Sequence, residues 1–267
     1  MYAFEYQNPS TAAAAIGSAK GDARFLAGGQ SLVQAMKLRL SQTGTLVDLS
    51  GIAELKGISV AGSNVIIGAM TRHSEVARSA EVKQAIPALA DLAGGIGDQM
   101  VRNQGTLGGS IANADPAACY PAAILGLGAT IKASVGQKER AITGDSFFTG
   151  LFETTLAPGE LITSVEFPVP DCAAYVKFKQ PASRFALVGV FVAKFGSTVR
   201  VAVTGAKSSV FRATDIEAAL SKSFTPEAAA AVKVSANGMN GDMHGSAEYR
   251  AAMVSVMAGR AVARALG

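Results

Sequence analysis

The order of apolar and polar positions divides the chain into a first part, in which strands and helices alternate, and a last part, in which strands precede helices. Short apolar strands are predicted at residues 23–27 and 45–49, and a helix with apolar periodicity at 31–40 separates them. A strand–helix–strand unit of this kind requires its two strands to pair in parallel. A helix is also predicted at 11–20, with Asn8-Pro9-Ser10 at its start. The N-terminal part is therefore predicted to be α/β.

The middle of the chain begins with a hairpin signal. Residues 58–61 and 65–68 are strand-like and flank the turn Gly62-Ser63-Asn64. Helical patterns follow at 74–84 and 88–94. The remaining elements predicted in this part are a helix at 122–127 and strands at 129–135 and 162–167.

The last part of the chain reads as an α+β unit. Three antiparallel strands are predicted at 174–179, 186–195 and 198–204, and they are followed by helices at 215–220, 226–235 and 247–266. The segment Pro168-Val169-Pro170-Asp171 precedes them and is typical of a boundary. We therefore expect lobes at 1–52 and 53–168 and a C-terminal domain at 169–267.

Composition indicates a globular protein with a sizeable core, because 49% of the residues are hydrophobic and 16% are charged. The sequence holds no run of about 18 apolar residues, and its start lacks the basic-then-apolar order of a signal peptide. The net charge of +4 includes no basic block, so we expect no nucleic-acid partner. Cys119 and Cys172 are too few for a disulfide scaffold or a metal cluster. These features favour a cytoplasmic protein with free thiols.

Two glycine-rich segments carry the candidate chemistry. Residues 25–32 follow a predicted strand and open a predicted helix, and residues 102–116 form a predicted loop between helical patterns. Glycines let backbone N–H groups approach a ligand, and Ser and Thr hydroxyls add donors, as a pyrophosphate requires. Neither segment contains a Gly-Lys-Ser/Thr motif, and Met100 takes the place of a third glycine after Gly95-Ile96-Gly97. A P-loop enzyme and an ordinary Rossmann dehydrogenase are therefore disfavoured.

The two segments resemble a known pair of motifs. Ala27-Gly28-Gly29-Gln30-Ser31-Leu32 and the run from Arg102 to Pro116 are similar to the two FAD-binding motifs of the medium subunits of molybdenum hydroxylases, among them carbon monoxide dehydrogenase medium subunits and bacterial xanthine dehydrogenase FAD subunits. The resemblance continues at 67–71, 175–179 and 246–250, so it covers essentially the whole chain. It implies a mixed α/β and α+β fold, with a two-lobed FAD-binding unit of the vanillyl-alcohol-oxidase-like (PCMH) type and a C-terminal domain containing a three-stranded antiparallel sheet and helices.

The resemblance also implies where FAD binds. Residues 26–32 would enclose the pyrophosphate from one side and 106–110 from the other, leaving the isoalloxazine between the domains. Lys177 would lie near the flavin, where a fixed cation stabilises negative charge on the reduced ring. No catalytic or metal-ligating residue is assigned. The FAD contacts implied by the resemblance are Leu26, Ala27, Gly28, Gly29, Gln30, Ser31, Leu32, Asn103, Thr106, Gly108, Gly109, Ser110, Asn113, Asp115, Leu161 and Lys177.

The sequence departs from the family pattern at one position. Where many relatives carry an acidic residue a few places after the second motif, this chain has Cys119, and Asp115 would cover part of the lost role. His73, at a predicted loop-to-helix junction, is interpreted as a cap or surface residue, and His244 as a loop residue with too few neighbours for a metal site.

The function that the resemblance implies is electron transfer. FAD would accept electrons from iron–sulfur clusters on a small partner subunit, after substrate oxidation at a molybdenum cofactor on a large one, and would pass them to a quinone, NAD or oxygen. We expect a dimer of heterotrimers. Two alternatives remain open: a self-contained FAD-dependent oxidase or dehydrogenase of small molecules, which would need a substrate cap and an acid–base residue, and a module that has lost FAD.

Overall fold

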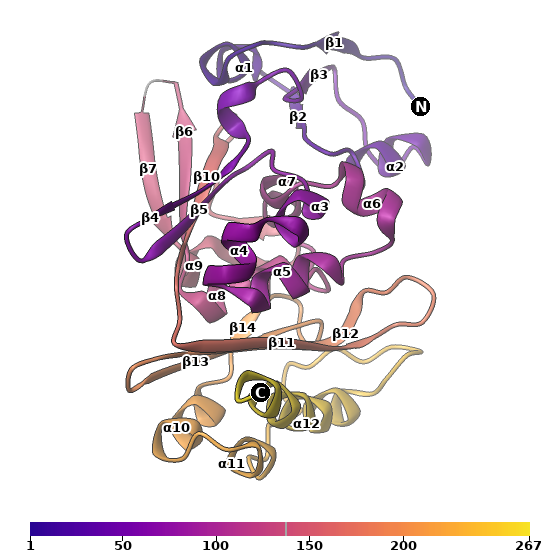
Figure 1. The fold of residues 1–267 in the computed structure, drawn as a ribbon. Helices are drawn as coiled ribbons and strands as arrows, with labels where there is room; N and C mark the ends of the chain where they lie inside the picture. Colours follow the sequence, from indigo (N-terminus) through magenta and orange to yellow (C-terminus); the bar gives the residue numbers. More distant parts are fainter. Residues whose placement is uncertain (137) are drawn as a thin grey trace.

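The structure is a computed structural model that describes residues 1–136 and 138–267, arranged in three tiers (Figure 1). The first tier holds a three-stranded parallel sheet in the order β1 (Glu5–Gln7), β3 (Thr45–Asp48), β2 (Arg24–Leu26). Helices α1 (Ala12–Ser18) and α2 (Leu32–Lys37) connect these strands. The predicted parallel strand–helix–strand unit is confirmed. Thr11 caps α1, so Asn8-Pro9-Ser10 lies outside that helix.

The second tier is built on a five-stranded antiparallel sheet. Its order is β4 (Ile58–Ala61), β5 (Asn64–Gly68), β10 (Leu161–Pro168), β6 (Thr130–Val135), β7 (Lys138–Thr143). The predicted hairpin is the β4–β5 pair. The helices of this tier are α3 (His73–Arg78), α4 (Ala80–Ala85), α5 (Pro87–Gly94), α6 (Gln99–Gln104), α7 (Leu107–Asn113), α8 (Tyr120–Leu127) and α9 (Gly144–Phe147). Smaller elements are a 3-10 turn at Ala53–Leu55 and the strand pair β8 (Phe148–Gly150) and β9 (Glu153–Thr154).

Two predictions for this tier were wrong. The single helix expected at 74–84 is broken at Ser79, whose hydroxyl accepts the N–H of Val82 and starts α4. The loop expected at 102–116 is largely helical, because α6 and α7 occupy most of it. Glycine disfavours helix in isolation, and tertiary contacts have overridden that preference here.

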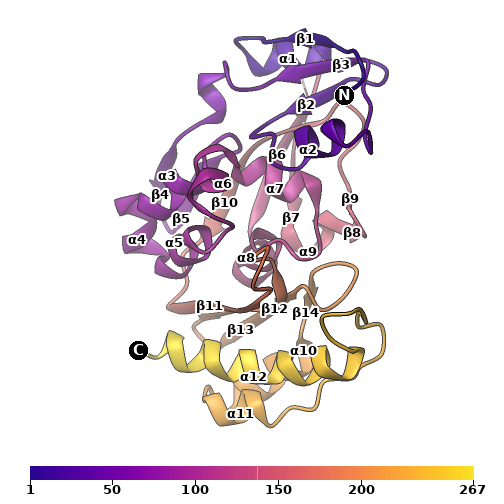
Figure 2. The same ribbon diagram turned by 90° about the vertical axis from the view of Figure 1, so that its right-hand side faces the viewer.

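The third tier contains a four-stranded antiparallel sheet in the order β11 (Cys172–Lys179), β12 (Ala186–Phe195), β13 (Thr198–Thr204), β14 (Phe211–Arg212). The three predicted strands are confirmed, and β14 was too short for its pattern to be recognised. Helices α10 (Thr214–Lys222), α11 (Pro226–Ala230) and α12 (Ala247–Ala265) follow. The helix predicted at 226–235 ends five residues early. Figure 2 shows α12 running along this sheet on the side away from α8.

The β11–β14 sheet is buried on both faces. Alternate residues such as Tyr175, Phe191 and Ala193 belong to the core of the second tier, where α5 and α8 pack against the sheet. Val190 and Val201 point the other way, into the core formed with α10 and α12. This alternation follows from the period of two along a strand. The packing of both faces holds the third tier against the second and sets the position of β11, the strand that carries Lys177.

Candidate functional site

The two glycine-rich segments meet in space, which their separation in sequence did not require. A Cβ atom at Gly28 would lie 2.1 Å from the carbonyl oxygen of Gln104, and one at Gly109 would lie 3.0 Å from the Cβ of Ala27. Side chains at either position would hold the segments apart. Glycine therefore serves here for close approach of backbone to backbone.

The first segment presents unused backbone donors. Across residues 1–136 and 138–267, no acceptor receives the backbone N–H groups of residues 28–31. Gly29, with φ of +69°, supplies a left-handed turn within this run, which ends where α2 begins at Leu32. A run of free amides in a turn is a concavity suited to an anion.

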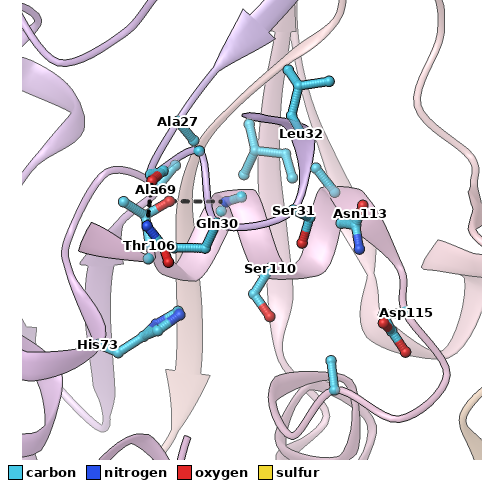
Figure 3. Close-up of a pocket in the computed structure, with 18 of the residues that line it drawn as sticks. Ala27, Gln30, Ser31, Leu32, Ala69, His73, Thr106, Ser110, Asn113 and Asp115 are labelled. Atoms are coloured by element: carbon cyan, nitrogen blue, oxygen red, sulfur yellow. Dashed lines mark hydrogen bonds between the residues drawn. The ribbon is translucent and has the colours of Figure 1, made fainter. Parts of the chain in front are cut away.

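The second segment contributes differently from expectation. The N–H groups that begin α7 are already bonded: Leu107 donates to Thr71 (3.1 Å), Gly108 to Ala69 (2.8 Å) and Gly109 to the Thr106 hydroxyl (3.2 Å). The prediction that both segments present free amides is therefore right for the first and wrong for the second. What α7 presents to the cavity is the side chains of Ser110 and Asn113, which lie close to Ser31 in Figure 3.

These elements enclose a cavity of about 580 Å³ between the tiers. Its wall combines both glycine segments with β10, β11 and the β11–β12 turn. The predicted site residues that line it are Ala27, Gly28, Gly29, Gln30, Ser31, Leu32, Thr106, Gly108, Gly109, Ser110, Asn113, Asp115, Leu161 and Lys177. Leu26 and Asn103 are not among the described lining residues: Leu26 packs beneath Gly29, and Asn103 is exposed on α6, bonded to Gln99.

His73 is a lining residue that the sequence analysis set aside. It is 5% exposed, so the interpretation as a cap or surface residue was wrong. Burial, followed by the nearby charge of Arg102, lowers the pKa of its imidazole to about 4. Its Nδ1 finds no hydrogen-bond partner in the part of the chain that the structure describes, and its ring lies against Tyr120 at 5.3 Å between centroids. No periodicity in the sequence marked this burial.

Acidic and thiol groups line another part of the wall. Asp115 lies at the opposite end of the close-up from His73 (Figure 3), and burial raises the pKa of its carboxyl group despite the N–H of Ala117 at 2.8 Å. Cys119, the departure noted in the sequence, is buried and also faces the cavity. An acidic side chain is therefore present in the wall, although at position 115.

Two cations lie at the end of the cavity next to β11. The Lys177 ammonium donates to the carbonyl oxygens of Gly95 and Arg184, each at 2.8 Å. The Arg184 guanidinium, on the β11–β12 turn, donates to the carbonyl of Gly97 at 3.2 Å. Arg184 was missed because a turn residue gives no pattern. Two positively charged side chains therefore lie at this end of the cavity.

The donor set fits a dinucleotide with a pyrophosphate. Free amides and hydroxyls lie on one stretch of the wall, cations lie at its β11 end, and apolar groups such as Leu32, Leu161 and Phe185 complete the lining. Among the described residues, no group of three His, Cys, Asp or Glu side chains could hold a metal ion. Nor does any helix of the described chain have the length and apolarity needed to cross a membrane.

Comparison with curated proteins gives relatives over nearly the full length. The chain is 37% identical over 276 residues to the carbon monoxide dehydrogenase medium chain of Hydrogenophaga pseudoflava, covering 97% of this chain and 96% of the relative. It is 34% identical to the 6-hydroxypseudooxynicotine dehydrogenase complex subunit alpha of Paenarthrobacter nicotinovorans, covering 92% and 87%.

Solved structures agree with the fold. Quinoline 2-oxidoreductase from Pseudomonas putida 86 matches with a TM-score of 0.91 at 29% identity, covering 99% of this chain and 97% of that chain. Carbon monoxide dehydrogenase from Hydrogenophaga pseudoflava matches with a TM-score of 0.87 at 33% identity, covering 99% and 98%. These matches confirm the two-lobed FAD-binding fold with its C-terminal α+β unit.

A family model described as the FAD binding domain in molybdopterin dehydrogenase matches residues 2–170 and identifies the family. That match includes both glycine segments and most of the cavity wall, and the relatives extend it through β11 and α12. The chain therefore belongs to the FAD-binding medium subunits of the molybdenum hydroxylases.

Proposed function

We propose that this chain carries electrons between subunits, taking them from iron–sulfur clusters on a small partner and passing them to an external acceptor, while a large partner oxidises the substrate at a molybdenum cofactor. The single observation that supports this best is the cavity itself. Its free amides at 28–31 provide an anion cradle, and Lys177 and Arg184 supply positive charge at the other end. Relatives of similar length are a medium chain and a subunit of a dehydrogenase complex.

The residues of this chain would bind and orient the cofactor. Residues 28–31 would donate backbone N–H groups to the FAD pyrophosphate, and Ser31 and Ser110 would add hydroxyl donors. Bound FAD supplies the redox chemistry, because its ring accepts and releases electrons. Gly28 and Gly109 allow the two halves of this cradle to close on each other.

The β11 end of the cavity would hold the charge that reduction creates. The Lys177 ammonium, which is held by two carbonyl oxygens, favours negative charge nearby, since a preorganised cation requires no rearrangement, and the exposed Arg184 guanidinium adds positive charge. The buried His73, with its pKa of about 4, stays neutral at pH 7 and adds no further positive charge. The chain thus offers electrostatic stabilisation rather than an acid–base residue.

We also infer the setting of the subunit. The sequence has two cysteines, and a four-cysteine cluster therefore belongs to a partner. A dimer of heterotrimers in the cytoplasm is the assembly that we propose, with the free thiols of Cys119 and Cys172 in keeping with a reducing compartment.

The test is the visible absorption spectrum of the native complex, purified from its source without added cofactor. We expect flavin bands overlaid with broad iron–sulfur absorption. The chain produced alone should bind FAD. Its flavin should remain oxidised when small organic substrates are added in the absence of the partner subunits. A chain that stays colourless after incubation with FAD would contradict the proposal. Bleaching of the lone flavoprotein by a simple substrate would favour a self-contained oxidase instead.

A further inference from the structure

The Lys177 ammonium has all of its donors engaged within the protein. Besides the two carbonyl oxygens at 2.8 Å, it approaches the Sγ of Cys119 at 3.3 Å. An ammonium group has three donors, so these acceptors use them all. They come from three different segments: the loop after α5, the β11–β12 turn and the start of α8.

The three acceptors are all without formal charge in their ordinary neutral forms. Two are carbonyl oxygens, and the third is a thiol sulfur, which is a weak acceptor. Lys177 forms no ion pair with any carboxylate within the described ranges 1–136 and 138–267. Its charge is therefore held in place without a carboxylate in direct contact among the described residues.

A second buried group lies beside the same sulfur. Tyr175 is two residues before Lys177 on the same face of β11, is 6% exposed, and its hydroxyl lacks a hydrogen-bond partner among the described residues. Burial raises the pKa of this phenol well above its ordinary value, and the neighbouring Cys119 adds to the rise. Any charge at position 119 would therefore act on an uncharged, desolvated phenol as well as on the ammonium.

We propose that Cys119 is a positioning residue, which holds the Lys177 ammonium at the cavity wall without neutralising it, so that the full charge acts on bound flavin. This inference rests on the proposed function. A carboxylate at position 119 would accept the same N–H and form an ion pair, and the two opposite charges would largely cancel at the flavin. The thiol keeps the hydrogen bond and avoids the cancellation, which raises the midpoint potential of the flavin.

The experiment compares Cys119→Asp with Cys119→Asn, which has the same shape and no charge, in the reconstituted holoenzyme complex. The readout is the flavin midpoint potential from a spectroelectrochemical titration. We expect Cys119→Asp to lower the equilibrium constant for two-electron reduction at least tenfold relative to Cys119→Asn, which corresponds to about 30 mV. Cys119→Ser should remain close to the unaltered protein, because a hydroxyl is also a neutral acceptor.

Lys177→Met provides an independent check if Cys119→Asp does not fold or retain flavin. Removing the ammonium should lower the same equilibrium constant by a similar factor. Equal potentials for the Asp and Asn variants, or an unchanged potential for Lys177→Met, would overturn the inference. A potential for Cys119→Ser well above that of the unaltered protein, together with a potential for Cys119→Asp equal to it, would do the same, because it would mean that the sulfur already carries a negative charge. A wild-type chain that retains no FAD would instead refute the proposed function.

Discussion

At the scale of single residues, Gly28 leaves less room for an added Cβ than any other described glycine. Its Cβ would meet the carbonyl oxygen of Gln104 at 2.1 Å and the Cα of Gly105 at 2.7 Å, and both are backbone atoms that cannot rotate away. We expect Gly28→Ala to raise the dissociation constant for FAD at least tenfold, about 1.4 kcal/mol, by separating the two glycine segments. A fluorescence titration with FAD measures this.

The matched control is Gly17→Ala in α1. A Cβ at Gly17 meets no described atom within 4 Å, and the substitution should stabilise the helix slightly, by about 0.5–1 kcal/mol, without affecting FAD. An unchanged FAD affinity in Gly28→Ala would mean that the segments tolerate separation, and the cradle would have to be located elsewhere.

His73 predicts a specific dependence of stability on pH. Its pKa is about 4 in the folded chain and 6.5 in the unfolded one, so between these values the unfolded state binds the proton more strongly. The contribution of the neutral His73 imidazole to the free energy of unfolding is complete above pH 6.5. It is lost as the pH falls toward 4, with about 2 kcal/mol lost by pH 5. His73→Gln removes this proton linkage.

Denaturant unfolding followed by circular dichroism at pH 7 and pH 5 checks this prediction. The difference in unfolding free energy between the wild-type chain and His73→Gln should change by about 2 kcal/mol between the two pH values. Because all other groups titrate in both proteins, this difference isolates residue 73. If the stabilities of the wild-type chain and His73→Gln changed in parallel, the imidazole would be protonated in the folded state at pH 5, or would be less buried than its 5% exposure indicates.

At the scale of elements, the sequence predicted what depends on local pattern. The β11, β12 and β13 strands were identified because segments rich in apolar, β-branched and aromatic residues persist over seven to ten residues. Helix α7 was missed because Gly108 and Gly109 disfavour helix locally, whereas tight contacts with Ala69 and Ala27 favour it in the fold. Such contacts cannot be read from one segment alone.

The same limit applies to the candidate site. The motif pair indicated which residues would gather, and most of them line one cavity. Which amides remain free could not be predicted, because it depends on Ala69 and Thr71 supplying carbonyl oxygens to α7. The burial of His73 likewise depends on its packing against Tyr120 and Gly105, which are distant in the sequence.

The close packing of α8 on the β11–β14 sheet predicts that an enlarged side chain on α8 destabilises the fold. A Cβ at Gly126 would lie 2.7 Å from the Cδ1 of Phe191, a fully buried ring on β12. We expect Gly126→Ala to lower the unfolding free energy by about 1–3 kcal/mol, because an overpacked core must shift side chains or backbone. Urea unfolding measures the loss.

Gly94→Ala in α5 is the control for this substitution. The nearest atom to a Cβ at Gly94 is the Cβ of Ala77 at 3.8 Å, an ordinary contact, so the change should be neutral or slightly stabilising. If both variants unfold at the same urea concentration, the α8–β12 contact adapts more easily than its geometry implies.

At the scale of the whole molecule, the third tier shares one of its two core clusters with the second tier. One face of the β11–β14 sheet contributes Tyr175, Phe191, Ala193 and Ala202 to the cluster that includes α5 and α8. The proposed boundary near residue 168 therefore separates a C-terminal segment that has a core of its own with α10 and α12 but also shares a second core with the preceding tier. Lys177 reinforces this link, since it bonds to Gly95 in the loop that follows α5.

A fragment of residues 169–267 produced alone should consequently not reach a native state. Its sheet would keep the face covered by α10 and α12, while the face with Tyr175 and Phe191 would be exposed to water. We expect this fragment to bind the dye ANS and to unfold without a cooperative transition, whereas the full chain binds little dye and unfolds in one step by two different probes. A monomeric fragment that unfolds cooperatively and binds no dye would contradict this, because it would require the α10–α12 face alone to supply enough buried apolar surface to offset the conformational entropy of folding.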